Sequence, residues 1–188
     1  ILVYSSRLKN SLHAYDASTN IVSIFSGGKL IVSAEADRTI HVLDLEKKGQ
    51  DSLVLKGHDW DILSLALSPD GSVLASGSYQ KILFWDIQNG MNIGEISLAH
   101  RGEVLSIAFS PDGKTLASGG DDKVVRLWDV ENMEQIGEPL IGNEGSIWSV
   151  AFSGDGDILA SGDVDKICLW HMSDSQKECK ALMGTDIG

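Results

Sequence analysis

Three residues near the middle of the chain, Ser118, His100 and Asp122, have the types that acyl-transfer chemistry needs. Such catalysis uses a nucleophile, a base and a carboxylate that orients the base. No Gly-x-Ser-x-Gly sequence, which would expose the serine on a sharp turn, surrounds Ser118. A hydrolase is therefore the disfavoured interpretation, and the repeat described below favours a structural role for the three side chains.

A second segment, Gly113-Lys114-Thr115, imitates the end of a phosphate-binding loop. That loop needs another Gly five residues before its second Gly, and Ala108 stands there instead. The segment also belongs to a predicted β-turn, so no helix N-terminus faces an anion. We interpret it as a turn.

Four carboxylates crowd a short stretch near the C-terminal end and suggest calcium at first sight. Their spacing does not match the twelve-residue calcium loop, and Asp is common in turns because it accepts local backbone hydrogen bonds. We therefore expect turn residues, no metal and no cofactor; the four are Asp155, Asp157, Asp163 and Asp165.

The two cysteines, Cys168 and Cys179, are too few for a disulfide scaffold or a structural zinc site. Cys168 lies on a predicted strand and is expected to pack as a small apolar side chain. His41 and His171 lack the spacing of metal ligands. These features favour a reducing compartment, which we expect to be the cytoplasm, with the nucleus as the open alternative.

Composition excludes several classes of protein. The 188 residues carry a net charge of −12 and are 43% hydrophobic, as in an ordinary folded domain. The pI of about 4.6 and the lack of a basic stripe argue against a nucleic-acid partner. No apolar stretch is long enough to span a bilayer, and the N-terminus lacks the layout of a secretion signal.

A tandem repeat is the strongest signal in the chain. Ser68-Pro69-Asp70-Gly71 recurs as Ser110-Pro111-Asp112-Gly113 and as Ser153-Gly154-Asp155-Gly156, at intervals of 42 and 43 residues. Trp85, Trp128 and Trp170 repeat in step. A period of this size indicates one small structural unit per repeat.

Each repeat reads as short strands separated by polar turns. In the second repeat the predicted strands cover residues 62–67, 73–76, 81–85 and 92–98, and in the third they cover 104–109, 115–118, 124–128 and 134–140. No stretch shows a 3.6-residue apolar period of helical length. The chain is therefore predicted to be all-β.

Units of this length that end in Trp-Asp resemble the WD-repeat β-propeller family. The resemblance rests on Gly57-His58 with Trp85-Asp86, on Ala99-His100 with Trp128-Asp129, and on the turns between them. It implies an all-β propeller with four-stranded antiparallel blades. It covers nearly the whole chain and says little about function, because this fold hosts many unrelated roles.

The family holds its blades with a buried tetrad of His, Ser or Thr, Asp and Trp. By resemblance, the third repeat carries all four members. The second has Gln80 in place of the Asp, and the fourth has Asn143 in place of the His. The implied tetrad residues are His100, Ser118, Asp122 and Trp128, then His58, Ser76 and Trp85, then Ser161, Asp165 and Trp170.

The length corresponds to about four and a half repeats. We expect a partial blade at residues 1–20 and blades at about 21–56, 57–98, 99–141 and 142–188. Propellers of this family mostly have seven blades, so the chain is predicted to be part of a larger propeller. The alternatives are closure of the propeller by self-assembly or by assembly with another chain.

Partners of this family often bind at the start of the innermost strand and just before the tetrad Asp. Trp148 and Tyr79 are the best aromatic anchors among these positions. Trp60 either joins them or simply covers the end of a blade. The predicted partner-binding residues are Trp148, Tyr79, Asp61, Leu63, Glu103, Leu105, Asp121, Ser146 and Val164.

The sequence therefore predicts a non-catalytic scaffold or sensor that binds proteins and serves as a regulatory part of a larger protein or complex. The net charge of −12 favours a basic or mixed-charge protein partner. The alternative from the structural class is an assembly module that completes a propeller with another chain.

Overall fold

The computed structural model describes residues 19–25, 29–47, 52–174 and 177–183. These residues form four antiparallel sheets, and each sheet is built from consecutive strands of the chain. The strands that were expected within residues 1–18 lie outside the described residues. No helix in the described part of the chain is long and apolar enough to cross a membrane.

The first two sheets are simple four-stranded meanders. The first contains β1 (Thr19–Phe25), β2 (Leu30–Glu35), β3 (Thr39–Asp44) and β4 (Leu53–Lys56). The second contains β5 (Ser64–Leu67), β6 (Val73–Gly77), β7 (Lys81–Asp86) and β8 (Met91–Ser97). Below, the four sheets are called blades one to four.

Blade three contains β9 (Val104–Phe109), β10 (Thr115–Gly120) and β11 (Val124–Asp129), and its outer strand is split into β12 (Glu134–Gln135) and β13 (Leu140–Ile141). The continuous strand predicted over 134–140 is therefore wrong in its middle. Gly137 has a φ of +65°, and Pro139 has no backbone N–H to donate to β11. Blade four contains β14 (Ser149–Phe152), β15 (Ile158–Gly162), β16 (Lys166–His171) and β17 (Lys180–Met183).

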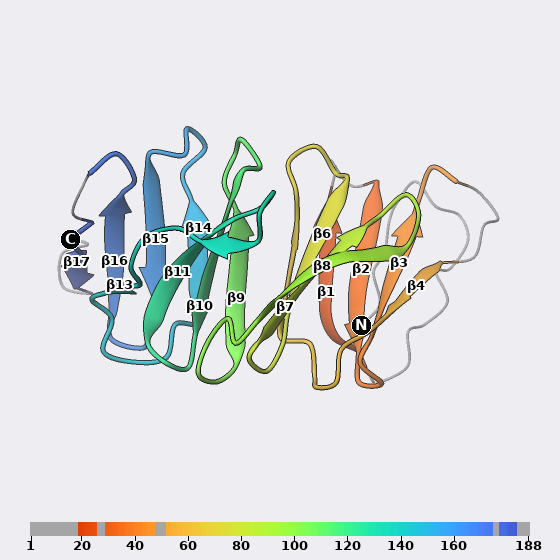
Figure 1. The fold of residues 1–188 in the computed structure, drawn as a ribbon, viewed down its shortest axis with the longest axis horizontal. Coiled ribbons are helices and arrows are strands. Elements are labelled where there is room, and N and C mark those ends of the chain that lie inside the picture. The colour runs from red at the N-terminus through yellow and green to blue at the C-terminus, as the bar shows by residue number, and fades with distance from the viewer. Residues whose placement is uncertain (1–18, 26–28, 48–51, 175–176, 184–188) are drawn as a thin grey trace.

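The four blades stand in a row, with blade one and blade four at opposite ends (Figure 1). The innermost strands β1, β5, β9 and β14 contact one another in turn along the row. The all-β propeller-blade architecture predicted from the repeats is confirmed, and the described blades form an open stack.

Each inner blade is buried on both faces, which explains why its strands read as continuous apolar runs. In β7, Leu83 and Trp85 pack in a cluster with blade one, whereas Ile82 and Phe84 pack in a cluster with blade three. Because successive side chains of a strand point to opposite faces, every residue of this run finds a core. A third cluster joins blades three and four.

The repeated turn between the first two strands of blades two, three and four uses its Ser and Asp side chains for local hydrogen bonds. Ser110 donates its hydroxyl to Asp112 and accepts the backbone N–H of Thr115. The pKa of Asp112 is held below its ordinary value, chiefly by the Ser110 hydroxyl. Asp155 is bonded in the same way by Ser153 and by the N–H of Asp157, so it is a turn residue, and no metal-binding cluster occurs among the described residues.

Cys168 packs among apolar side chains as expected, but its disulfide was not predicted from the sequence. Cys168 is fully buried in the cluster between blades three and four, but it forms a disulfide with Cys179. The two residues lie 11 apart in sequence, on β16 and immediately before β17. The spacing alone gave no sign that adjacent strands would bring the two sulfur atoms together.

Candidate functional site

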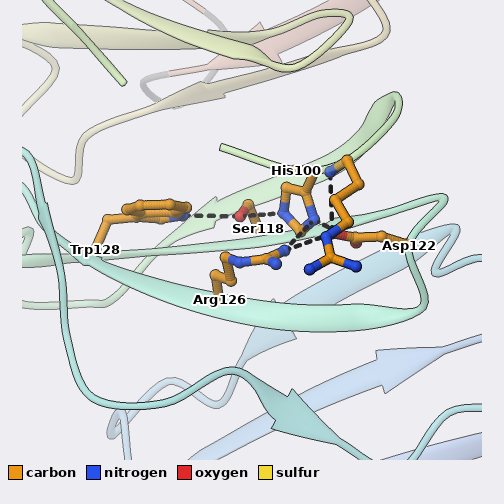
Figure 2. Close-up of polar contacts among 6 residues, drawn as sticks. His100, Ser118, Asp122, Arg126 and Trp128 are labelled. Atoms are coloured by element: carbon orange, nitrogen blue, oxygen red, sulfur yellow. Dashed lines mark hydrogen bonds and ion pairs between the residues drawn. The ribbon is translucent and has the colours of Figure 1, made fainter. Parts of the chain in front are cut away.

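Blade three contains a buried polar network at the end where β9 and β11 begin, which we call the network end of the blades. His100 Nε2 lies 2.7 Å from Ser118 Oγ, and Trp128 Nε1 donates to the same oxygen at 2.8 Å. On its other side, His100 Nδ1 lies 2.7 Å from Asp122 Oδ1 (Figure 2). The structure thus brings together all four residues that the resemblance selected in this repeat.

One arrangement of protons satisfies the three bonds that His100 and Trp128 make to Ser118 and Asp122. The imidazole donates from Nδ1 to the Asp122 carboxylate, Nε2 accepts the Ser118 hydroxyl proton, and the Ser118 oxygen accepts the indole N–H of Trp128. Ser118 is 0% exposed and His100 is 1% exposed. A substrate therefore has no open path to the serine, which counts against the triad interpretation.

Arg126 is a further member of this network that the sequence reasoning missed. Its guanidinium donates to Asp122 Oδ2 at 2.7 Å (Figure 2). Burial by itself would raise the pKa of Asp122, but hydrogen bonds from His100, Arg126 and the Arg101 backbone outweigh it and hold the pKa far below the ordinary value. The sequence held a signal for this contact, because Asp122 and Arg126 have opposite charges and lie four residues apart.

Blade four builds a related network with a different acid from the one predicted. Trp170 Nε1 donates to Ser161 Oγ, and the Ser161 hydroxyl donates to Asn143 Oδ1 at 2.7 Å. The amide of Asn143 donates to Asp163 Oδ2, whereas Asp165 is exposed and makes no side-chain contact in this network. The assignment of Asp165 to the tetrad is therefore wrong, and Asp163 holds that place.

The turn that carries the acid differs between the two blades. Gly119 pairs with Val125 in blade three, whereas Gly162 pairs with Ile167 in blade four, so the turn in blade four is one residue shorter. Counting four residues onward from the Ser, which finds Asp122 after Ser118, overshoots in the shorter turn. Burial would raise the pKa of Asp163, but the N–H groups of Asp165, Lys166 and Glu144 and the Asn143 amide keep it well below the ordinary value.

Blade two has the short turn as well, and its network is incomplete. His58 Nε2 lies 2.6 Å from Ser76 Oγ, which also accepts the indole N–H of Trp85. The residue directly after Gly77 is Ser78, and its hydroxyl donates to the Asp61 carbonyl instead of meeting His58. As a result, His58 Nδ1 is buried with no partner among the described residues.

The missing acid changes the titration of His58. Burial, reinforced by the positive charge of Lys81, lowers the pKa of His58 to about 4. Gln80, which the sequence places in the acid position, has a positive φ of 57° and uses its backbone to bond to blade three. Blade one departs further, because Ser33 donates to Glu35 and Leu43 stands in the Trp position.

The predicted partner-binding residues lie around the network end, and the most exposed apolar ones are Val164, Trp148 and Tyr79, at 74%, 59% and 43%. Tyr79 forms an antiparallel bridge with Glu103 that joins blades two and three. The ring centroids of Tyr79 and Trp60 lie 5.6 Å apart, so these two side chains form a pair on the surface. Of the remaining predicted residues, Asp61, Glu103 and Asp121 are exposed, and Leu63, Leu105 and Ser146 are half-buried.

Two carboxylates of this surface have no cationic partner within the described part of the chain, namely Glu103 and Asp121. Asp61 faces the Arg38 guanidinium at 3.8 Å, and Asp59 pairs with Lys81 at 3.3 Å. These two exposed pairs neutralise part of the charge beside Trp60, so the unpaired negative charge lies toward blade three.

Two clefts at the opposite end of the blades, of about 300 and 440 Å³, occupy the same place between successive blades. The larger lies between blades two and three and includes Pro69 and Gly113; the smaller lies between blades three and four and includes Pro111 and Gly156. In both, the Pro ring of one turn faces the positive-φ Gly of the next. The recurrence shows that these clefts follow from the stacking of the repeats.

Comparison with known families gives the same repeats. The family model described as "WD domain, G-beta repeat" matches residues 49–86, 94–129 and 134–171. The first match runs from β4, the outer strand of blade one, to β7 of blade two. Each matched repeat thus supplies the outer strand of one blade and the inner strands of the next, which joins the blades along the chain.

Relatives that match at the sequence level are WD-repeat proteins. The chain is 34% identical over 87 residues to "WD repeat and SOCS box-containing protein 1" of Danio rerio, covering 45% of this chain and 21% of that protein. It is 32% identical over 72 residues to "F-box/WD repeat-containing protein 10" of Mus musculus, covering 38% of this chain and 7% of that protein. It is 25% identical over 106 residues to "Transcriptional corepressor LEUNIG_HOMOLOG" of Arabidopsis thaliana, covering 51% of this chain and 14% of that protein.

Proposed function

The chain belongs to the WD domain, G-beta repeat family, and from this premise we propose that its blades are a non-catalytic platform on which protein partners bind at the network end. WD-repeat modules are typically protein-interaction scaffolds.

The observation that carries the proposal is the contrast between buried polar side chains and exposed aromatic ones at the same end of the blades. The Ser, His and Trp members of the networks are enclosed, whereas Trp60 and Trp148 are 58% and 59% exposed. Large aromatic side chains are the commonest anchors of protein interfaces. The networks accordingly hold the blades, and the aromatic residues above them contact the partner.

Charge favours a partner with basic or mixed character. Glu103 and Asp121 lie beside the aromatic pair without a cation in the described residues, and the whole chain has a net charge of −12. A negative field of this kind speeds the association of positively charged partners and suppresses that of acidic ones. The preference for a basic partner should weaken as the salt concentration rises.

A regulatory role within a larger protein or complex is supported by the relatives. Two of them are named for a second element beside their WD repeats, a SOCS box in one and an F-box in the other. The chain spans at most about a fifth of the length of the relatives described above. We therefore extend only this arrangement to the chain: WD repeats that bind a partner for another part of the protein.

The experiment is a quantitative affinity capture with the wild-type chain and the variants Tyr79→Ala and Trp148→Ala. Met91→Ala is the matched control, because Met91 is also an exposed apolar residue, at 57%, but lies on the outer strand β8. We expect the same proteins to be lost from both aromatic variants and kept by the control. Retention of every captured protein by both aromatic variants would rule out this surface.

A second candidate function is assembly with another blade-like sheet, and one observation favours it. Ile82, Val125 and Ile167 occupy equivalent positions in blades two, three and four, since each pairs with the Gly before the turn. Ile82 and Val125 are 0% exposed beneath the next blade, whereas Ile167 is 44% exposed. Blade four thus exposes the face that is buried in blades two and three.

Light scattering distinguishes this candidate from the first. A species of about 20.2 kDa that remains monomeric across a wide range of concentrations would exclude obligate assembly. A larger species that Ile167→Lys returns to the monomer would favour assembly through this face, because the lysine would place a charge against an apolar surface.

A further inference from the structure

Blade four secures its outer strand differently from the other blades. Each of the other outer strands buries an apolar side chain in a core: Leu55 in β4, Ile96 in β8 and Leu140 in β13, all 7% exposed or less. In β17, by contrast, Lys180, Ala181 and Leu182 are all exposed. These three residues thus give the strand no buried anchor, and they have little to hold them beyond the backbone ladder with β16.

The disulfide supplies the missing anchor. Cys179 is half-buried, directly precedes β17, and is bonded to Cys168 in the middle of β16, where the Cα atoms lie 5.0 Å apart. Cys168 is 0% exposed within the core between blades three and four. A covalent bond therefore ties the strand to the core at the point where the other blades use packing alone.

The same bond lies against the connection that enters blade four. A side chain on Gly142 would collide with Cys179 and would lie 2.8 Å from the Trp170 ring and 3.2 Å from the sulfur of Cys168. The next residue, Asn143, belongs to the Ser161 and Trp170 network. The disulfide, the crossover from β13 and the polar network of blade four thus form one contiguous cluster.

We propose that the Cys168–Cys179 disulfide is a redox-sensitive latch that fixes β17 and the Gly142–Asn143 crossover, and that a dithiol reductant opens it. In the exchange, a thiolate of the reductant attacks one protein sulfur, the S–S bond breaks, and a mixed disulfide forms. The second thiolate of the reductant then releases the other protein sulfur. The protein gains two electrons and two protons and becomes two thiols, while the dithiol is oxidised to its own disulfide.

Opening the latch has a local consequence and leaves most of the stack intact. Reduction removes the covalent constraint, and β17 then depends on its ladder with β16, residues 166–169 paired with 180–183. Local opening of such an edge becomes more frequent when its anchor is lost. Blade two contributes no residue to the cluster that contains the two cysteines, so its strands should be unaffected.

The test is peptide-resolved hydrogen exchange on the full chain before and after treatment with dithiothreitol. We expect reduction to speed the exchange of peptides covering 177–183 and 142–146 by about tenfold and to leave β6 and β7 unchanged. Cys179→Ala is the control, because its exchange in these peptides should already be fast and should not respond to the reductant. Alkylation should label no thiol in the untreated protein and two thiols after reduction.

Three results would overturn the proposal. The first is labelling of both cysteines in the untreated folded protein, which would mean that the bond is absent. The second is exchange in 177–183 that does not change on reduction. The third is an equal response to the reductant in Cys179→Ala, which would assign the effect to another group.

Discussion

A single missing acceptor separates blade two from blades three and four at the level of side chains. His100 meets Asp122 and Asn143 meets Asp163, but His58 Nδ1 has no partner among the described residues. Ser78 and Asp163 occupy the same backbone position, because the N–H of each bonds to the carbonyl of the Lys three residues on. An acid at position 78 would therefore stand where the acid of blade four stands.

Ser78→Asp should accordingly stabilise the protein by about 1 kcal/mol, since the new carboxylate would accept the Nδ1 proton of His58. Ser78→Ala is the comparison variant, and it should be less stable than the wild type because the Asp61 carbonyl loses its hydroxyl donor. Urea denaturation at pH 7 measures both changes. A Ser78→Asp protein less stable than the Ser78→Ala protein would contradict this account of the His58 site.

His58 also predicts how stability depends on pH. Its folded-state pKa of about 4 lies below the ordinary value of 6.5, so the unfolded chain binds a proton that the folded chain refuses. The free energy of unfolding should be highest above about pH 6.5 and should fall by roughly 2–3 kcal/mol as the pH drops to about 4. Below that pH, His58 should cause little further loss of stability.

Denaturation midpoints measured between pH 7 and pH 4.5 test this dependence. His58→Asn is the matched control, because blade four already uses Asn143 at the equivalent position and an amide does not titrate. The control should lose much of the slope in this window. The carboxylates of Asp122 and Asp163 titrate far below their ordinary range, so they contribute at lower pH. An unchanged slope in His58→Asn would show that another group controls the effect.

At the level of elements, the turn between the second and third strands decides which residue enters each network. In blade four Asp163 accepts the N–H groups of Asp165 and Lys166 with one oxygen and those of Asn143 and Glu144 with the other. This one side chain therefore fixes both its own turn and the loop that enters the blade.

Asp163→Ala should consequently destabilise the protein by about 1–3 kcal/mol, because several N–H groups lose a charged acceptor. Asp165→Ala should cost less than about 0.5 kcal/mol, as an exposed position outside the network. Thermal or chemical unfolding of the pair provides the comparison. Equal losses in the two variants would mean that the turn does not depend on Asp163.

These elements also show what the sequence could and could not predict. Most strands of the second and third repeats were predictable because turn residues and apolar runs recur with a constant period, although the outer strand of blade three was not. The set of His100, Ser118, Asp122 and Trp128 followed from the resemblance to the WD-repeat family. The choice between Asp163 and Asp165 was not predictable, because the acid lies two residues after the Ser in blade four but four residues after it in blade three. The Cys168–Cys179 bond was not predictable either, since it depends on the pairing of β16 with β17.

For the molecule as a whole, the interfaces between successive blades provide much of the stability. Three apolar clusters fill the spaces between successive blades, and each matched repeat carries the outer strand of one blade into the next. Stability in such arrays is approximately a sum of repeat and neighbour terms, so a defect in one network weakens its own blade most. The exposed residues at the network end can then change without cost to the stack.

The central claim is that the buried networks hold the blades while the aromatic surface above them binds partners. The direct measurement is thermal unfolding and partner capture on two proteins, Ser118→Ala and the double variant Trp60→Ala with Tyr79→Ala. The Ser118→Ala protein should unfold several degrees lower, because His100 and Trp128 lose their shared partner, yet bind partners below that temperature. The double variant should keep its unfolding temperature and lose the partners; unchanged stability in Ser118→Ala, or full partner binding by the double variant, would contradict the account.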